Sequence, residues 1–203
     1  AGSASAGSSG VSTADAEAFG SFAETLVKEE VFLLNDALGR LADVHTRQEE
    51  MDDEEKWKQQ SSSVRREREQ RLEQVKRTAR GFLDLAKAGL SALLHLTADR
   101  DVCATFATHP QRARKLAAML GKFLTMLCGP DAQSLKVKDP TKLGWVPKQT
   151  LTDTAMLLLN SAAGSASFAT LLGESDTFDI AMLSKAYSIL ENKCSFPPLH
   201  LEK

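Results

Sequence analysis

The sequence predicts an all-α fold, made of stacked antiparallel helix pairs in an irregular, solenoid-like core with a long helical hairpin on its N-terminal side. Apolar residues recur at spacings of three and four over several long segments, as they do on one face of an α-helix. Proline and glycine mark the ends of those segments, and no segment alternates with the period of two that a β-strand requires. The sequence has no strict repeat period, so it does not establish a regular solenoid.

The N-terminal part divides into a lead-in and a first long helix. Residues 1–10 hold only Ala, Gly and Ser, which bury too little apolar surface to offset the entropy of ordering, so residues 1–13 are predicted to be a flexible lead-in. Ser12 and Thr13 offer helix caps, and a long amphipathic helix is predicted from the apolar positions that follow: Phe19, Phe22, Leu26, Leu33, Ala37, Leu41 and Val44. The helical core domain is predicted over residues 14–193, with a tail or linker over 194–203.

A second long helix returns beside the first. We expect Ser61 to Ser63 to cap it, and its stripe has the clearest periodicity in the chain: Leu72, Val75, Ala79, Phe82, Ala86, Gly89, Leu93 and Leu96, widened by Leu83, Leu90 and Leu94. The short polar connection predicts an antiparallel hairpin. The widened stripe implies burial against more than one partner, which argues against a strict two-stranded coiled coil.

The tip of this hairpin carries opposite charges. Six of the seven residues 49–55 are acidic, and arginines open the returning helix. One interpretation is a docking surface, whose candidate residues are Glu49, Glu50, Asp52, Asp53, Arg65 and Arg66. The simpler alternative, which we favour, is a solvated hairpin end whose exposed ion pairs each contribute only ~0.2 to 1 kcal/mol.

Four helices and one further short segment follow the hairpin. A short one is predicted over residues 99–108, and Pro110 begins a third long helix with Leu116, Met119, Leu120, Phe123, Leu124 and Leu127 on its core side. Pro147 begins the next, which is expected to bury Leu151, Ala155, Leu158 and Leu159. A short segment over residues 167–172 precedes a helix capped by Thr177, with Phe178, Leu183, Ala186 and Leu190 on its apolar face.

A long polar connector, residues 127–151, separates two of these helices. Gly129 is expected to accept a left-handed C′ conformation, and Pro130 prevents the helix from continuing. Asp139 and Pro140 form a second stop. The connector also holds four apolar residues, which are Leu135, Val137, Leu143 and Trp145. A segment of this length is usually functional or held by its own side chains, so we predict an ordered, packed loop.

Composition and charge bear on the partners and the location expected of this protein. The chain has 203 residues, 42% of them hydrophobic, and a net charge of −2, which gives no electrostatic reason to expect nucleic acid or an anionic membrane as a partner. We expect a monomer. We also expect it in the cytoplasm or nucleus, since Cys103, Cys128 and Cys194 lack disulfide or metal-ligand spacing and no apolar run reaches membrane-span length.

No catalytic, cofactor or metal site is predicted. The four histidines are scattered, and no nucleophile elbow or phosphate-binding loop is present. His45 and His95 lie on or beside apolar helix faces, so packed, hydrogen-bonded imidazoles are expected there. Cys103 and Cys128 are expected to be small core residues.

Several of these stretches resemble a known family when they are taken together and in order. They are FLLNDA from Phe32, QEEM from Gln48 and LAAML from Leu116, together with a pattern in the connector. That pattern consists of GP at Gly129, LKVKDP from Leu135, LGW from Leu143 and PK at Pro147. Over roughly residues 19–190 the chain resembles the helical core of the ubiquitin chain-elongation factors that carry a C-terminal U-box, of the ubiquitin fusion degradation type. The resemblance marks Asn35, Asp36, Gly129, Pro130, Leu135, Val137, Asp139, Pro140, Gly144 and Trp145 as family-signature structural residues.

This resemblance implies a non-catalytic scaffold, the C-terminal part of that core, which positions a U-box and partners for polyubiquitin chain extension in protein degradation. Implied partners are a ubiquitin-conjugating enzyme bound through the U-box, ubiquitinated substrates and an AAA-type segregase. No U-box is found up to Lys203. The alternative is a helical-repeat adaptor without ubiquitin chemistry.

One contact is also predicted within the signature residues. The resemblance pairs the Asn35 segment with the connector, whose backbone groups lack helical partners. We therefore expect Asn35 to hydrogen-bond the connector backbone between Leu135 and Asp139, and Asp36 to face solvent or pair with a lysine. The alternative is that both residues lie on an exposed edge of the helix.

Overall fold

The computed structural model describes residues 13–176 and 178–193, and this part of the chain is helical without any strand. The elements are α1 (Thr13–Asp52), α2 (Glu54–Gln59), α3 (Ser62–Ala98), α4 (Arg100–Ala107), α5 (Pro110–Cys128), the 3₁₀ helices η1 (Pro130–Leu135) and η2 (Pro140–Leu143), α6 (Pro147–Gly164), α7 (Phe168–Gly173) and α8 (Ile180–Lys193). The prediction of an all-α fold is confirmed.

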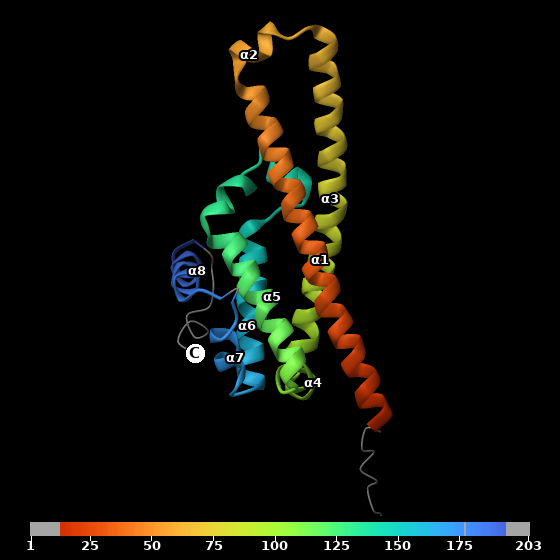
Figure 1. Ribbon diagram of the computed structural model, residues 1–203, viewed down its shortest axis with the longest axis vertical. Helices are drawn as coiled ribbons and strands as arrows, with labels where there is room; N and C mark the ends of the chain where they lie inside the picture. Colours follow the sequence, from red (N-terminus) through yellow and green to blue (C-terminus); the bar gives the residue numbers. More distant parts are fainter. Residues whose placement is uncertain (1–12, 177, 194–203) are drawn as a thin grey trace, which may run out of the picture.

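The helices form a hairpin and a smaller stack beside it. α1 and α3 run antiparallel along the length of the molecule and make its most extensive contact, with α2 at the tip (Figure 1). α4, α5 and α6 pack beside the half of the hairpin away from the tip, and α7 and α8 lie on the far side of α5 and α6 (Figure 1). No helix among residues 13–176 and 178–193 is long and apolar enough to cross a membrane.

The helix starts follow the capping residues of the sequence. Ser61 Oγ accepts the Val64 amide at 3.4 Å at the start of α3, and Asp99 Oδ1 accepts the Asp101 and Val102 amides, each at 3.0 Å, before α4. Pro110 and Pro147 open α5 and α6 as predicted. The predicted cap Thr177 lies outside the described residues.

The predicted apolar stripes locate the core, with one shift in register in α1 and another in α6. Phe22 is 52% exposed, so its expected place in the core is wrong; the buried face of that half of α1 passes through Ala23 and Val27. α6 buries Leu157 together with Thr154, while the expected Leu158 lies half-buried. The main core joins α1, α3, α4, α5, α6, α7 and the connector, and a second cluster joins α5, α6 and α8.

A carboxylic acid that no sequence pattern predicts lies inside the contact between α1 and α3. Glu30 of α1 is 1% exposed, and neither of its carboxyl oxygens has a hydrogen-bond partner. Burial raises the pKa of Glu30 to about 8, so the acid is mostly protonated at neutral pH. Gly89 of α3 provides the space, because a Cβ there would lie 2.0 Å from Glu30 Oε2.

Candidate functional site

The connector between α5 and α6 begins at Gly129, whose predicted left-handed conformation is wrong. Gly129 has φ −72° and ψ −174°, which is extended rather than left-handed backbone. The position needs glycine for a different reason: a Cβ would lie 2.3 Å from the Thr125 carbonyl oxygen, which accepts the Gly129 amide at 2.7 Å. Pro130 then opens η1.

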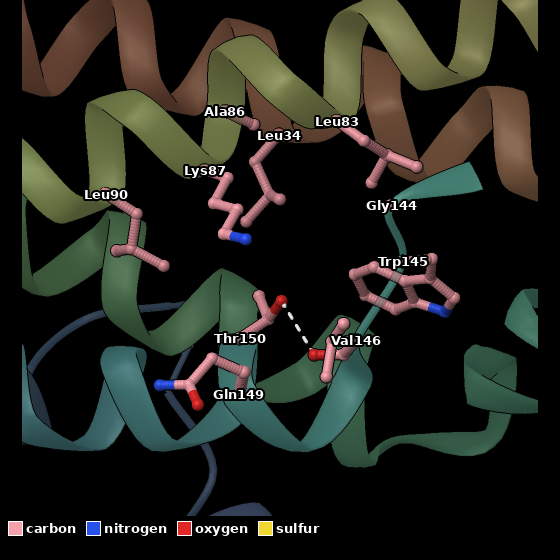
Figure 2. Close-up of a pocket in the computed structure, with 10 residues that line it drawn as sticks. All are labelled: Leu34, Leu83, Ala86, Lys87, Leu90, Gly144, Trp145, Val146, Gln149 and Thr150. Atoms are coloured by element: carbon pink, nitrogen blue, oxygen red, sulfur yellow. Dashed lines mark hydrogen bonds between the residues drawn. The ribbon is translucent and has the colours of Figure 1, made fainter. Parts of the chain in front are cut away.

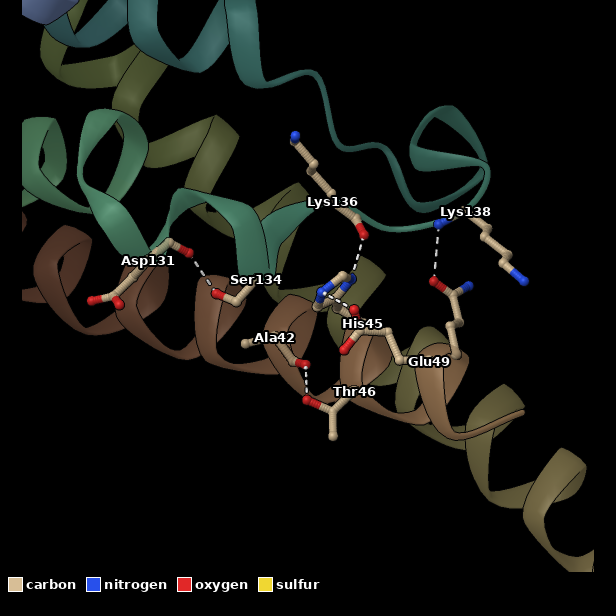
Figure 3. Close-up of polar contacts among 9 residues, drawn as sticks. Ala42, His45, Thr46, Glu49, Asp131, Ser134, Lys136 and Lys138 are labelled. Atoms are coloured by element: carbon tan, nitrogen blue, oxygen red, sulfur yellow. Dashed lines mark hydrogen bonds and ion pairs between the residues drawn. The ribbon is translucent and has the colours of Figure 1, made fainter. Parts of the chain in front are cut away.

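Two side chains of α1 hold the middle of the connector (Figure 3). His45 Nδ1 donates to the Lys136 carbonyl oxygen at 2.6 Å, and its Nε2 lies 3.3 Å from Glu49 Oε1. Three residues further along α1, the buried Gln48 Oε1 accepts the Lys138 amide at 2.9 Å. The two bonds fix the connector backbone to one face of α1, and His45 is a hydrogen-bonded imidazole as predicted.

The predicted bond from Asn35 to the connector is wrong. Asn35 Oδ1 is buried without a hydrogen-bond partner. Within the predicted segment, the Lys136 and Lys138 backbone meets α1 at His45 and Gln48, ten and thirteen residues further on, which at 1.5 Å per residue is about 15 to 20 Å away. Asp36 pairs with Arg40 of its own helix at 3.2 Å rather than with a lysine.

The second half of the connector contains the left-handed backbone. Asp139 (φ 52°) and Gly144 (φ 73°) flank η2, which Pro140 opens. The Lys142 ammonium donates to Asp139 Oδ2 at 2.9 Å and lowers the pKa of that carboxyl. Aspartate is one of the few non-glycine residues that adopts this conformation readily, so the stop predicted at Asp139 has a conformational basis.

The apolar residues of the connector face the hairpin. Leu135, Leu143 and Trp145 are buried within the main core, and Val137 packs against it partly buried. The Trp145 amide donates to the Pro140 carbonyl oxygen at 3.0 Å. A small cavity of ≈ 30 Å³ remains where Gly144, Trp145 and Val146 meet Leu34 of α1 and Leu83 of α3 (Figure 2). The prediction of an ordered, packed loop is confirmed.

Acidic side chains of the candidate surface at the hairpin tip form ion pairs with other residues of the chain. Glu49 faces His45, and Glu50 Oε2 lies 3.5 Å from Arg68 Nη1 across the hairpin. Asp52 pairs with Lys138 of the connector. These contacts link the two helices and the connector to one another.

One further residue of that surface, Asp53, stabilises the short turn instead. Asp53 caps α2 by accepting the Lys56 amide at 3.2 Å, and the Lys56 ammonium beside it lowers the pKa of Asp53. Arg65 is half-buried and its Nε has no hydrogen-bond partner, whereas Arg66 is exposed. Neither arginine forms an ion pair with the described acidic residues. The helix α2 itself was not predicted.

Residues with reactive side chains are dispersed. Cys103 and Cys128 are buried, as predicted, and burial raises the pKa of the Cys103 thiol. His95 is exposed on α3, so its expected packed position is wrong. Within residues 13–176 and 178–193, no three His, Cys, Asp or Glu side chains converge as a metal site. Cys194 lies outside the described residues.

The amino-acid sequence of this chain is similar to one protein family and to several named proteins. The family model described as "Ubiquitin elongating factor core" matches residues 9–203. Similar proteins are "Ubiquitin conjugation factor E4 ufd-2" of Caenorhabditis elegans, 31% identical over 63% of this chain and 13% of its own length; "E4 ubiquitin-protein ligase UFD2" of Saccharomyces cerevisiae, 28% identical over 93% of this chain and 20% of its own; and "Ubiquitin conjugation factor E4 A" of Rattus norvegicus, 30% identical over 68% of this chain and 13% of its own. The chain thus spans 13% to 20% of the length of these relatives.

Proposed function

This chain belongs to the ubiquitin elongating factor core family, and from that premise we propose that it is a non-catalytic scaffold segment of a U-box ubiquitin chain-elongation ligase. In this role it holds the U-box and the ubiquitinated substrate in a fixed relation while a conjugating enzyme bound to the U-box extends the chain. The names of the relatives, which are conjugation factors and a ubiquitin-protein ligase, support a role in chain elongation.

The observation that carries the proposal is the way the connector joins the hairpin to the helices behind it. His45 and Gln48 bind the connector backbone, and Trp145 anchors it in the core. A ligase without a covalent ubiquitin intermediate accelerates transfer by positioning its partners, and small errors in position are costly. A stiff joint between helix pairs is the property that such a scaffold requires.

The experiment that tests the proposal uses the full-length protein with a loosened joint. We expect Trp145→Ala to slow ubiquitin chain extension on a pre-ubiquitinated substrate at least tenfold, which corresponds to a loss of about 1.4 kcal/mol in positioning. Discharge of the conjugating enzyme onto free lysine, which needs only the U-box, should stay unchanged. Phe22→Ala, at an exposed position of α1, is the matched control and should affect neither rate. Unchanged chain extension in a Trp145→Ala protein with a measurably weakened core would contradict the proposal.

A second assay separates this function from that of a helical-repeat adaptor without ubiquitin chemistry. The purified chain, mixed with activating enzyme, conjugating enzymes and ubiquitin, should form no more chains than the conjugating enzyme alone. A U-box encoded after Lys203 supports the scaffold, and an unrelated domain there supports the adaptor. We further propose an AAA-type segregase as a partner and the cytoplasm or nucleus as the location.

A further inference from the structure

A large concave apolar surface of the described chain lies away from the connector, between α7 and α8. We call it the α7–α8 groove. Its volume is ≈ 470 Å³, and its floor and walls include Leu124 of α5, Leu158 of α6, Phe168 and Leu172 of α7, and Leu183 and Tyr187 of α8. Every lining residue is apolar apart from the Tyr187 hydroxyl and backbone groups.

The groove exists because of the way the last two helices pack. α7 lies on α5 and α6, and α8 lies on the same two helices, while α7 and α8 make few contacts with each other. The gap leaves apolar side chains in water: Ile180 is 70% exposed and Tyr187 is 40% exposed. Exposed apolar surface gathered in a concave site marks a binding surface more often than scattered apolar residues do.

The borders of the groove are acidic. Gly173 and Phe178 line it, and the exposed Glu174, Asp176 and Asp179 lie beside them in the chain. Glu191 is exposed next to the lining residue Leu190. None of these four carboxylates forms an ion pair with a described side chain, and Lys185 is the one cation whose side chain is described between residues 173 and 192.

We propose that the α7–α8 groove binds an amphipathic helix of a partner protein, which places three large apolar side chains in the groove and lysine or arginine beside it. A cavity of about 150 Å³ holds one benzene-sized group, so the groove has room for roughly three such side chains. Three anchors at i, i+4 and i+7 are the usual pattern of a helix in a groove. The acidic border, whose carboxylates form no ion pair with a described side chain, selects cationic flanks and raises the association rate. This inference is independent of the ubiquitin-related function proposed above.

The first test is the binding of two synthetic helical peptides, measured by fluorescence anisotropy with the full chain. Both peptides carry leucine at i, i+4 and i+7; one has lysine and arginine on its flanks and the other has glutamate at the same positions. The cationic peptide should bind at least about tenfold more tightly, and the preference should shrink as salt rises. Equal binding of both peptides, or no binding of either, would overturn the proposal.

The second test places the binding in the groove. The double variant Ile180→Asn with Tyr187→Asn keeps the net charge, so a merely electrostatic attraction to the acidic chain would survive it, whereas binding in the groove should fall at least about tenfold. The control is Phe22→Asn with Phe32→Asn, two comparably exposed apolar residues of α1 (52% and 58%), and it should bind like the wild type. Circular dichroism checks that both variants are folded.

A third variant and a self-association measurement complete the set. Glu174→Lys with Asp176→Lys should reverse the preference between the two peptides. Sedimentation of the wild-type chain should show a monomer at the concentrations used. Self-association that disappears in the Ile180 and Tyr187 double variant would assign the groove to a second copy of the chain and refute the partner helix.

Discussion

Replacing Glu30 with glutamine should remove a pH dependence of stability that this buried acid gives to the hairpin. The pKa of Glu30 rises from 4.5 to about 8 in the folded chain because the carboxyl is taken out of water without a partner. Between these two values the folded protein holds a proton that the unfolded protein has lost. The free energy of unfolding should therefore fall as pH rises through this window, and the full stability is present only below about pH 4.5.

The size of the effect follows from the pKa difference. Each pH unit inside the window lowers the free energy of unfolding by about 1.4 kcal/mol, which amounts to a ceiling of about 4 kcal/mol between pH 5 and pH 8. It is a ceiling because local opening of the hairpin would let water reach the carboxylate and reduce the loss. Glutamine has the same shape and never ionises, so the variant and the wild type should differ by less than about 1 kcal/mol at pH 5.

The assay is a series of urea melts at pH 5, 6, 7 and 8. The difference between Glu30→Gln and wild type should grow steadily in favour of the variant as pH rises, and the other titrating groups cancel in this difference. Glu29→Gln, at the exposed neighbouring position, should track the wild type. A difference that stays flat from pH 5 to pH 8 would refute the reasoning.

The opposing glycine gives an independent check of the same contact. Gly89→Ala should lower stability by about 1 to 3 kcal/mol despite the better helix propensity of alanine, because its methyl group would overlap the Glu30 carboxyl. In a Glu30→Ala background the same change should become stabilising by up to about 1 kcal/mol. A loss of equal size in both backgrounds would show that Glu30 is not the group that Gly89 accommodates.

Three further predictions concern the connector and are read from the free energy of unfolding. Gly129→Ala should cost about 1 to 3 kcal/mol because its Cβ meets a backbone carbonyl, whereas Gly173→Ala, with open space around it, should be nearly neutral; equal effects would contradict the contact. Gln48→Ala should cost about 1 to 2 kcal/mol through the lost bond to the connector, while Asn35→Ala should cost less than about 0.5 kcal/mol, since its buried oxygen has no partner to lose; the reverse order would refute the assignment. Trp145→Ala should cost about 3 to 5 kcal/mol as a fully packed aromatic residue, and a loss below about 1 kcal/mol would show that the connector is loosely held.

The boundaries of most helices could be predicted from sequence because single residues determine them. Pro110 and Pro147 restrict the backbone directly, and Ser61 and Asp99 supply the oxygen that the first free amides need. These effects are local, so they do not depend on what the helix packs against. The short α2 was missed because its start depends on Asp53 within a run of like charges that carries no apolar period.

The register of a long helix and the partners of its polar residues are less accessible to sequence reasoning. α1 passes several different partners along its length, so no single stripe describes its buried face, and the exposed Phe22 was assigned to the core in place of Ala23. Glu30 has no sequence signal, because its burial depends on the absence of a side chain at Gly89. The bonds of His45 and Gln48 depend on where the connector crosses α1, which a resemblance in sequence motifs did not reveal.

The support that the connector gives to α1 has a mechanical consequence. α1 has 40 residues and is about 60 Å long. The connector supports it at His45 and Gln48, close to the C-terminal end of the helix. The connector also reaches the last turn of α1 through the exposed Asp52–Lys138 ion pair, and α2 with the first turns of α3 forms an overhang beyond it. Because the deflection of a clamped beam grows with the cube of its free length, a force applied at α2 is transmitted to the helical body with little bending. Adding one helical turn after Gln48 would lengthen the overhang by about 5.4 Å and make it bend more easily. The distance from the connector contact to α2 therefore sets the stiffness of this end of the hairpin.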